Sequence, residues 1–358
     1  MTAERRGIAL TPMEIRRDVI VRMATLADEL GYEIFSVAEG WGLDSTVLLA
    51  EIATVTRRIK LMAGVLSVWG RTPGTIAMTA ATLHQICDGR FVLGLGASTR
   101  QLVEGWHAVR FTRPAGRLRQ VTENVRALLA GERARPAVVP EARPLRLGQP
   151  PVADLPIWIA ATGERTIRVA AELADGWFPL YLRRDRCREL AAEIRRLRAA
   201  VGRPGEPITV AAGPFTIVDP DIGAARAAAA ACTAFYLAAM GEVYPRLVSA
   251  QGLGEQVELV RAVNPAAGRE PGIVPDAAQI LLDEFTAYGD AAGVQEQLRR
   301  WDSVADITMV AVPPGMAWPK IEATLRAAAP GLTGRAPVVD PVEADRAVAL
   351  LPDGGVAG

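Results

Sequence analysis

Short apolar segments alternate with longer amphipathic segments along most of this 358-residue chain. The short segments are typical of buried parallel strands, and the longer ones repeat apolar residues at helical spacing. A chain that alternates in this way forms an α/β fold, and about eight repeats favour a single (β/α)8 TIM barrel over two smaller domains. The predicted strands are 7–10, 34–38, 58–66, 91–95, 156–161, 176–180, 208–218 and 307–312.

The alternation is interrupted twice, after the fourth and after the seventh predicted strand. Residues 131–155 are rich in Pro and Arg and are long for a simple connection, which predicts an insertion or a lid. Residues 224–301 predict a helical extension, and nothing in its part from 224 to 272 indicates a role. We expect one domain over residues 1–333 and a flexible tail over 334–358, which is rich in Gly, Pro and Ala.

The composition excludes several classes of function. The 40 basic and 40 acidic residues balance, so neither nucleic acid nor an anionic membrane is an expected partner. No uncharged apolar run is as long as a membrane span, and two histidines cannot supply the usual ligands of a metal hydrolase. No secretory leader is visible at residues 1–10, which predicts a cytoplasmic protein with reduced thiols at Cys87, Cys187 and Cys232.

Small and polar residues follow several predicted strands, at the end where a barrel carries its site. The turn after 156–161 opens a helix, so its N–H groups can face an anion, although the residues alone favour an ordinary capped turn. The single GxG pattern at the end of the strand 91–95, formed by Gly94 and Gly96, is weak evidence for any ligand. The candidate site residues are Glu39, Trp41, Gly64, Val65, Gly96, Ser98, Glu104, His107, Ala161, Thr162, Gly163, Glu164 and Arg165.

Five segments around these residues together resemble the luciferase-like superfamily of flavin and deazaflavin enzymes. The resemblance covers residues 31–180 well and 288–313 loosely. EGWG, EGWH and AATG are most similar to the branch that uses coenzyme F420, a deazaflavin that carries hydride. The segments are AEGWGLD (38–44), TRRIKLMAGVLSVWGRTPGTIAMTAATL (56–83), GRFVLGLGAS (89–98), EGWHAVRFTRP (104–114) and PIWIAATGERTIRVAAELADGWFPL (156–180).

The resemblance implies where a cofactor binds. It places the cofactor phosphate at residues 161–165 and a bulge with a cis peptide bond at Gly64 and Val65, behind the ring, with Gly96 and Ser98 beside it. Trp41 is expected to stack on the cofactor, to form a wall of the substrate pocket, or simply to pack at the barrel rim.

The resemblance also implies an acid–base residue near the reacting edge of the ring. Glu39 is the first candidate, because it follows the second predicted strand, and Glu104 and His107 are second candidates. Relatives that oxidise sugars or alcohols often carry His near Glu39, and this chain does not, so their catalytic assignment does not transfer directly.

The leading interpretation is a coenzyme F420-dependent oxidoreductase that moves hydride to or from a C=C, C=N or C=O group of a small organic substrate. The alternative is a two-component monooxygenase that uses reduced FMN and needs a flavin reductase as partner. A third interpretation is a barrel without cofactor that serves as a subunit of a complex. Apolar stretches at 77–83 and 118–129 suit a homodimer. The sequence does not indicate the substrate or the direction of hydride transfer.

Overall fold

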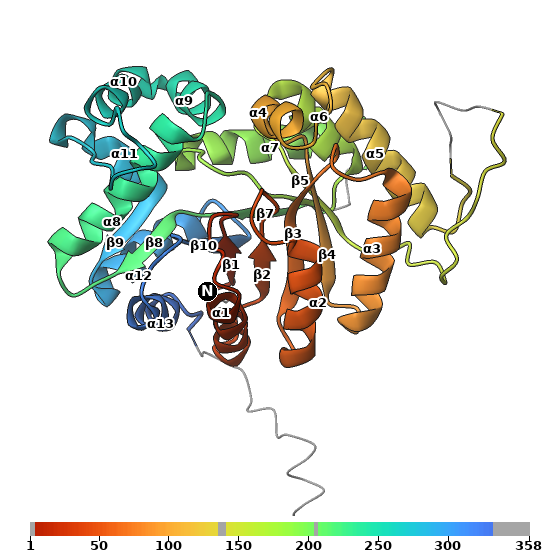
Figure 1. Ribbon diagram of the computed structural model, residues 1–358, viewed down its shortest axis with the longest axis horizontal. Coiled ribbons are helices and arrows are strands. Elements are labelled where there is room, and N and C mark those ends of the chain that lie inside the picture. The colour runs from red at the N-terminus through yellow and green to blue at the C-terminus, as the bar shows by residue number, and fades with distance from the viewer. Residues whose placement is uncertain (1–3, 135–140, 204–206, 332–358) are drawn as a thin grey trace, which may run out of the picture. The chain divides into compact units, whose positions relative to one another are not determined.

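The centre of the protein is a closed parallel β-barrel (Figure 1). The computed structural model describes residues 4–134, 141–203 and 207–331, and Glu4–Pro330 form one compact unit. The predicted tail, 334–358, lies outside the described residues. The barrel strands are β1 (Arg6–Leu10), β2 (Ile34–Val37), β3 (Lys60–Ser67), β4 (Phe91–Gly96), β5 (Ile157–Ala160), β6 (Gly176–Trp177), β7 (Thr209–Ala212) and β10 (Ile307–Val312).

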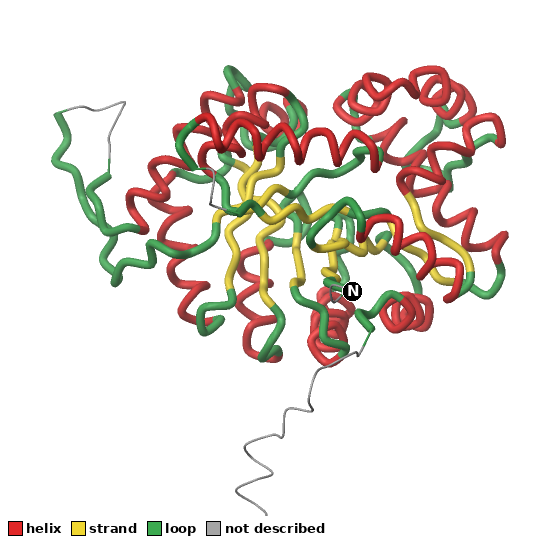
Figure 2. The backbone as a smooth tube through the Cα atoms, turned by 180° about the vertical axis from the view of Figure 1, so that it is seen from behind, coloured by secondary structure: helices red, strands yellow, loops and turns green. Residues whose placement is uncertain are grey.

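The strands pair in chain order, and β1 pairs with β10 to close the ring, with Gly7 opposite Met309. The predicted (β/α)8 TIM barrel is therefore confirmed. Helices surround the strands, as Figure 2 shows from behind. The helices between barrel strands are α1 (Arg17–Glu29), α2 (Ser45–Val55), α3 (Pro73–Ile86), α4 (Arg100–Gly105), α5 (Pro114–Leu129), α6 (Glu164–Leu173) and α7 (Arg184–Ala200), and α13 (Trp318–Ala327) follows β10.

Side chains from six barrel strands fill the inside of the barrel, as expected for this fold. A larger apolar cluster lies between the strands and the surrounding helices. The barrel is thus packed along its axis, and a ligand can only enter at its mouth. The inner residues are Ile34, Met62, Val92, Trp158, Ala211, Ile307 and Met309.

The seventh predicted strand, 208–218, forms two strands, β7 and β8 (Phe215–Val218). Gly213 and Pro214 separate them. A Cβ atom on Gly213 would overlap the backbone of Met309, and Pro214 has no N–H to donate to a sheet. β10 pairs first with β7 and then, through Ala311, with β8.

The predicted helical extension packs around an apolar core of its own, which includes Ala229, Cys232 and Leu281. The prediction of purely helical material is wrong at β9 (Thr286–Gly289), which pairs with β8. By length and composition the helix Ile222–Ala239 could cross a membrane, but 44% of it is buried and it packs into this core. The other elements are α8 (Ile222–Ala234), η1 (Phe235–Ala239), α9 (Val243–Val248), η2 (Ser249–Leu253), α10 (Gly254–Val263), η3 (Asp276–Ala278), α11 (Gln279–Phe285) and α12 (Ala291–Asp302).

Residues 131–155 connect the end of α5 to the start of β5, so they lie at the N-terminal ends of the barrel strands. Their described part projects from the barrel at the right of Figure 1, with Arg133 and Arg146 paired in an antiparallel bridge. Gln149 bonds to Thr82 on α3. Because a barrel site lies at the other ends of the strands, this position favours an insertion over a lid.

Candidate functional site

A cavity of about 400 Å³ opens at the C-terminal ends of the barrel strands. Its size suits a small-molecule site. Strand ends supply one part of its lining, the segment around α4 contributes Leu102 and Phe111, and the helical extension supplies the rest. The predicted site residues that line the cavity are Glu39, Trp41, Gly64, Val65, Gly96, Ser98, Ala161 and Thr162.

Strand β3 bulges at the cavity. The Gly64–Val65 peptide bond is cis, and the pairing of β3 with β4 shifts register between Ala63 and Leu66. The bulge that the resemblance implied is therefore present. A Cβ atom on Gly64 would overlap the Ser36 hydroxyl, so only glycine fits there. One wall of the cavity is therefore apolar and has few protruding side-chain atoms. It is formed by Gly64, Val65 and Gly96 of β4.

Glu39 is the only carboxylate among the described residues that line the cavity. Its side chain is 10% exposed. Its Oε2 accepts a hydrogen bond from the Ser67 N–H at 2.8 Å, and its Oε1 accepts one from Arg71. Arg71 also reaches Asp44 at 3.1 Å. These two donors fix the direction of the Glu39 carboxylate.

The turn from β5 into α6 borders the cavity through Ala161, Thr162 and Thr166. Gly163 is the N-cap of α6, and no side chain in the described structure caps this helix. Thr166 Oγ1 donates instead to the Gly163 carbonyl at 2.8 Å. The first N–H groups of a helix have no acceptor within it, so this turn can bind an anion.

Gly163, Glu164 and Arg165 are exposed beside this turn and are not among the lining residues. Glu164 pairs with Arg168 at 2.8 Å, which partly offsets its charge at the helix start. The predicted phosphate site is thus a turn whose polar atoms lie at the cavity edge, with the charged side chains further out.

The two other predicted catalytic residues lie outside the cavity lining. Glu104 accepts hydrogen bonds from Arg100 at 2.7 Å and from the Phe111 N–H at 3.0 Å, so it holds the loop after α4 in place. The His107 ring lies against Gly70, where a Cβ atom would be 2.6 Å from its Cε1. Glu104 and His107 therefore do not line the cavity beside Glu39.

The helical extension contributes a wall that the sequence analysis did not predict. We call its five cavity-lining residues the extension wall: Tyr236, Met240, Val243, Tyr244 and Leu247. Tyr236 lies in η1, a π-helix, a feature that is frequent at functional sites. Its ring meets that of Tyr244 edge to face, with centroids 4.9 Å apart. The sequence signal was slight: two tyrosines within and just beyond an Ala-rich run.

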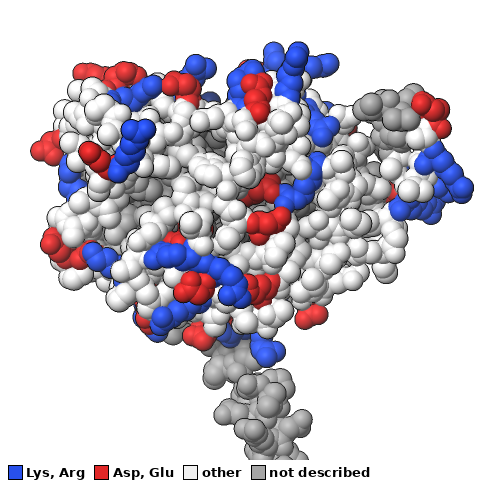
Figure 3. Space-filling model, viewed as in Figure 1, with Lys and Arg blue, Asp and Glu red and all other residues white. Residues whose placement is uncertain are grey.

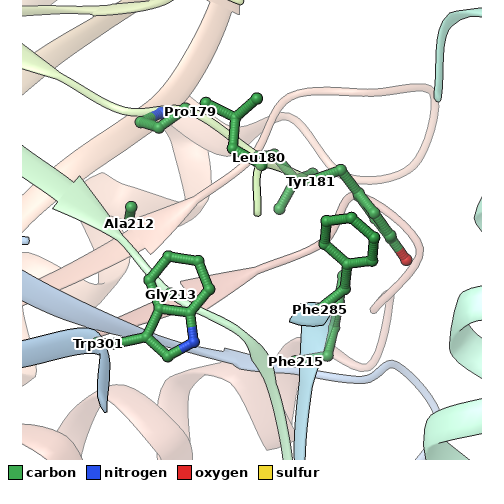
Figure 4. Close-up of a pocket in the computed structure, with 9 residues that line it drawn as sticks. Pro179, Leu180, Tyr181, Ala212, Gly213, Phe215, Phe285 and Trp301 are labelled. Atoms are coloured by element: carbon green, nitrogen blue, oxygen red, sulfur yellow. The ribbon is translucent and has the colours of Figure 1, made fainter. Parts of the chain in front are cut away.

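A much smaller hollow lies behind the segment Pro179, Leu180 and Tyr181, enclosed by Phe285 and Trp301 (Figure 4). Its volume is about 10 Å³, which is the space of one water molecule. It is therefore not a ligand site.

A third hollow of about 480 Å³ adjoins the cavity and shares Thr162 and Leu247 with it. Two arginines at the start of α7 line it, and each is paired with a carboxylate of that helix. Arg183 pairs with Asp185 at 3.0 Å, and Arg186 pairs with Glu189 at 2.9 Å. Its charges are thus balanced internally.

Thiol and metal chemistry find little support at these sites. Cys87, Cys187 and Cys232 are buried and unbridged, and burial raises the pKa of Cys87 to about 11 and that of Cys187 to about 12. Thiols with such pKa values are poor nucleophiles. Within the described ranges, no group of three or more His, Cys, Asp or Glu side chains could hold a metal ion.

Comparisons with known proteins agree with this geometry. A coenzyme F420-dependent oxidoreductase of Mycobacterium tuberculosis, as its name describes it, is 31% identical over 82% of this chain and 90% of its own. The 5,10-methylenetetrahydromethanopterin reductase of Archaeoglobus fulgidus is 28% identical to this chain. The match covers 80% of this chain and 86% of the reductase. The structure of the F420-dependent tetrahydromethanopterin reductase from Methanopyrus kandleri superposes on this one with a TM-score of 0.72. The superposition covers 91% of this chain and 97% of the reductase, at 20% sequence identity. The family model of luciferase-like monooxygenases matches residues 1–306. This chain belongs to the luciferase-like monooxygenase family.

Proposed function

We propose that the protein is a coenzyme F420-dependent oxidoreductase, which transfers hydride between the deazaflavin and a C=C, C=N or C=O group of a small organic substrate. Both curated relatives named above support it, one described as F420-dependent and the other as a reductase. One structural observation carries the proposal. The bulge of β3 and the uncapped start of α6 face the same cavity, so a flat ring and an anionic group can bind together.

The residues present fit such a cofactor. The surface of Val65 and Gly96 suits an apolar ring, and the N–H groups near Thr162, with the Thr162 hydroxyl group, suit a phosphate. Arg165, exposed next to this turn, adds positive charge for an anionic tail. When bound, the deazaflavin supplies the hydride acceptor or donor.

The chain itself orients the reactants and handles the proton. Glu39 is the carboxylate that reaches the cavity, so we assign proton transfer to it. Arg71 and the Ser67 N–H hold Glu39 in one direction, while the apolar lining from Leu102, Phe111 and the extension wall keeps water away.

The first test is a titration of the purified protein with coenzyme F420 and, separately, with FMN, followed by tryptophan fluorescence. We expect micromolar binding of F420 and weaker binding of FMN. Gly96→Val should abolish F420 binding, because the new side chain would extend towards Val65 in the cavity. Gly148→Val is the control and should leave F420 binding unchanged, because the space around Gly148 is open. A preference for FMN would favour the reductase-dependent monooxygenase, and binding of neither would contradict both.

The role of Glu39 is tested by turnover of the F420-loaded enzyme. Glu39→Gln should lower kcat by about 10²–10⁴-fold, the range for removal of a general acid or base, with little change in F420 affinity. Glu29→Gln is the matched control, because Glu29 is exposed at the end of α1 and lies outside the cavity lining, and it should keep its rate. Equal rates for the two variants would remove Glu39 from the chemistry.

The remaining expectations concern partners and location. On the face in Figure 3, basic and acidic side chains alternate, which supports the proposal that neither nucleic acid nor an anionic membrane is a partner.

Met78 and Ile86 on α3 are exposed apolar side chains, which supports a homodimer. A cytoplasmic location remains a proposal.

A further inference from the structure

The extension wall differs in origin from the rest of the cavity lining. Its residues belong to helices with their own apolar core, whereas the bulge of β3 and the turn before α6 belong to the barrel. If the barrel residues hold the cofactor, the extension wall is left to contact the substrate. Met240, Tyr244 and Leu247 are only partly buried and Val243 is 44% exposed, so apolar surface faces the open cavity there.

The cavity offers no free charge to a substrate. Apart from Glu39, every described residue that lines it is uncharged. Glu39 is already paired with Arg71, and the arginines of the adjoining hollow are paired with Asp185 and Glu189. A charged substrate would lose hydration here without gaining a counter-charge, which is costly.

The tyrosines keep this wall neutral and rigid. Burial raises the pKa of Tyr244 to about 12 and that of Tyr236 well above its usual value, so both hydroxyl groups stay protonated at neutral pH. Both rings also pack against Tyr181, with centroids 5.3 and 4.9 Å away. Such packing fixes the rings in place and presents their apolar faces and edges.

We propose that the extension wall selects an uncharged substrate that carries an apolar ring or chain next to its reducible C=C, C=N or C=O group. The inference rests on the proposed function, because it needs the cofactor on the barrel side of the cavity. It gives a role to the segment 224–272, for which the sequence indicated none.

Two matched probes test the charge preference. They are 2-acetylnaphthalene and 6-acetyl-2-naphthoic acid, two ketones that differ by one carboxylate. Their Kd values are measured by equilibrium dialysis against the full-length protein saturated with coenzyme F420, after the F420 Kd itself is known. We expect the neutral ketone to bind at least about tenfold more tightly, because the carboxylate must shed water without a cation to meet it.

A pair of valine variants locates the effect. Val243 and Val263 are both 44% exposed, at the start of α9 and the end of α10, and only Val243 lines the cavity. Val243→Lys should reduce the preference for the neutral ketone about tenfold by giving the carboxylate a partner. Val263→Lys should leave the ratio unchanged, and both should keep the wild-type F420 Kd.

Three results would overturn the inference: equal or tighter binding of the carboxylate by the wild-type protein, binding of neither probe at millimolar concentration, or the same ratio in Val243→Lys as in wild type. Failure of the wild-type protein to bind F420 in the preceding titration would instead contradict the proposed function.

Discussion

His107 illustrates how one ring can border a site without entering it. The ring packs on Gly70, and its buried Nε2 has no hydrogen-bond partner among the described residues. Burial lowers the pKa of His107, and the positive charge of Arg71 lowers it further. The neutral imidazole is therefore the form that the folded protein favours, next to the arginine that holds Glu39.

We expect the two imidazoles of the protein to be resolvable by NMR, and His107 to titrate below its usual pKa of 6.5. His84→Asn supplies the assignment. Because the unfolded chain takes up the proton first, stability should fall as pH drops from 6.5 towards the folded pKa and then level off. His107→Asn should remove that slope, whereas a His107 transition at or above 6.5 would contradict the described environment.

For individual residues, the sequence allowed us to predict side chains that follow strands, but not the residues that they contact. Glu39 and Gly64 were found because a strand end and a strand glycine are local signals. Arg71 lies 32 residues from Glu39, and nothing local links them. His107 was chosen for its chemistry, but its position depends on how the loop after α4 folds back over Gly70.

The first and last loops of the barrel are joined by Glu14. Its Oε1 accepts a hydrogen bond from the Arg16 N–H at 3.0 Å, and its Oε2 accepts one from the Gly315 N–H, also at 3.0 Å. Arg16 in turn donates to the Met316 carbonyl at 2.9 Å. Burial alone would raise the pKa of Glu14, but the hydrogen bonds from Arg16 and Gly315 outweigh it and hold this pKa below its usual value.

Glu14→Gln should lower the free energy of unfolding by about 1–3 kcal/mol at pH 7, because it weakens buried charge-assisted hydrogen bonds. The carboxylate is stabilised in the folded state, so its contribution is present above pH 4.5 and is lost as pH falls through the lower folded pKa. Urea titrations at several pH values should show the difference from wild type shrinking below pH 4.5. Glu29→Gln, an exposed change at the other end of α1, should have little effect at any pH.

Between elements, the sequence failed where pairing partners decide the structure. The run 208–218 is apolar throughout, and its break depends on the close approach of Gly213 to Met309 across the sheet. Strand β9 is only Thr286–Gly289, between α11 and α12, so helical patterns on both sides hide it. Its strand conformation comes from pairing with β8.

For the molecule as a whole, closure of the barrel is reinforced by a buried ion pair. Arg6 in β1 is 3% exposed and pairs with Asp302 at the end of α12, with one hydrogen bond of 2.8 Å. Thr308 Oγ1 in β10 donates to the same carboxylate at 2.6 Å. Asp302 therefore ties the first and last barrel strands together.

Asp302→Ala should lower the free energy of unfolding by about 3–5 kcal/mol, because it leaves the guanidinium of Arg6 buried without its main counter-charge. Urea denaturation followed by circular dichroism measures this. Glu296→Gln is the control, since it breaks an exposed ion pair with Arg299 on the same helix and should leave the midpoint unchanged. Similar midpoints for both variants would mean that closure does not depend on this pair.

The architecture as a whole was predictable, because strand number and parallel pairing follow from the alternating pattern. The part of the cavity lining that the barrel contributes was also predictable, because it comes from the ends of the predicted strands. The extension wall was not predictable, because Tyr236 and Tyr244 reach the cavity only through the packing of helices around Tyr181.

The pairing of β1 with β10 also constrains how the chain is made. During synthesis β1 emerges about 300 residues before its neighbour β10. Until then one edge of β1 lacks its strand, and such edges attract other chains. A protein of this kind should therefore fold slowly after release, and nascent chains with an open edge should be substrates for chaperones.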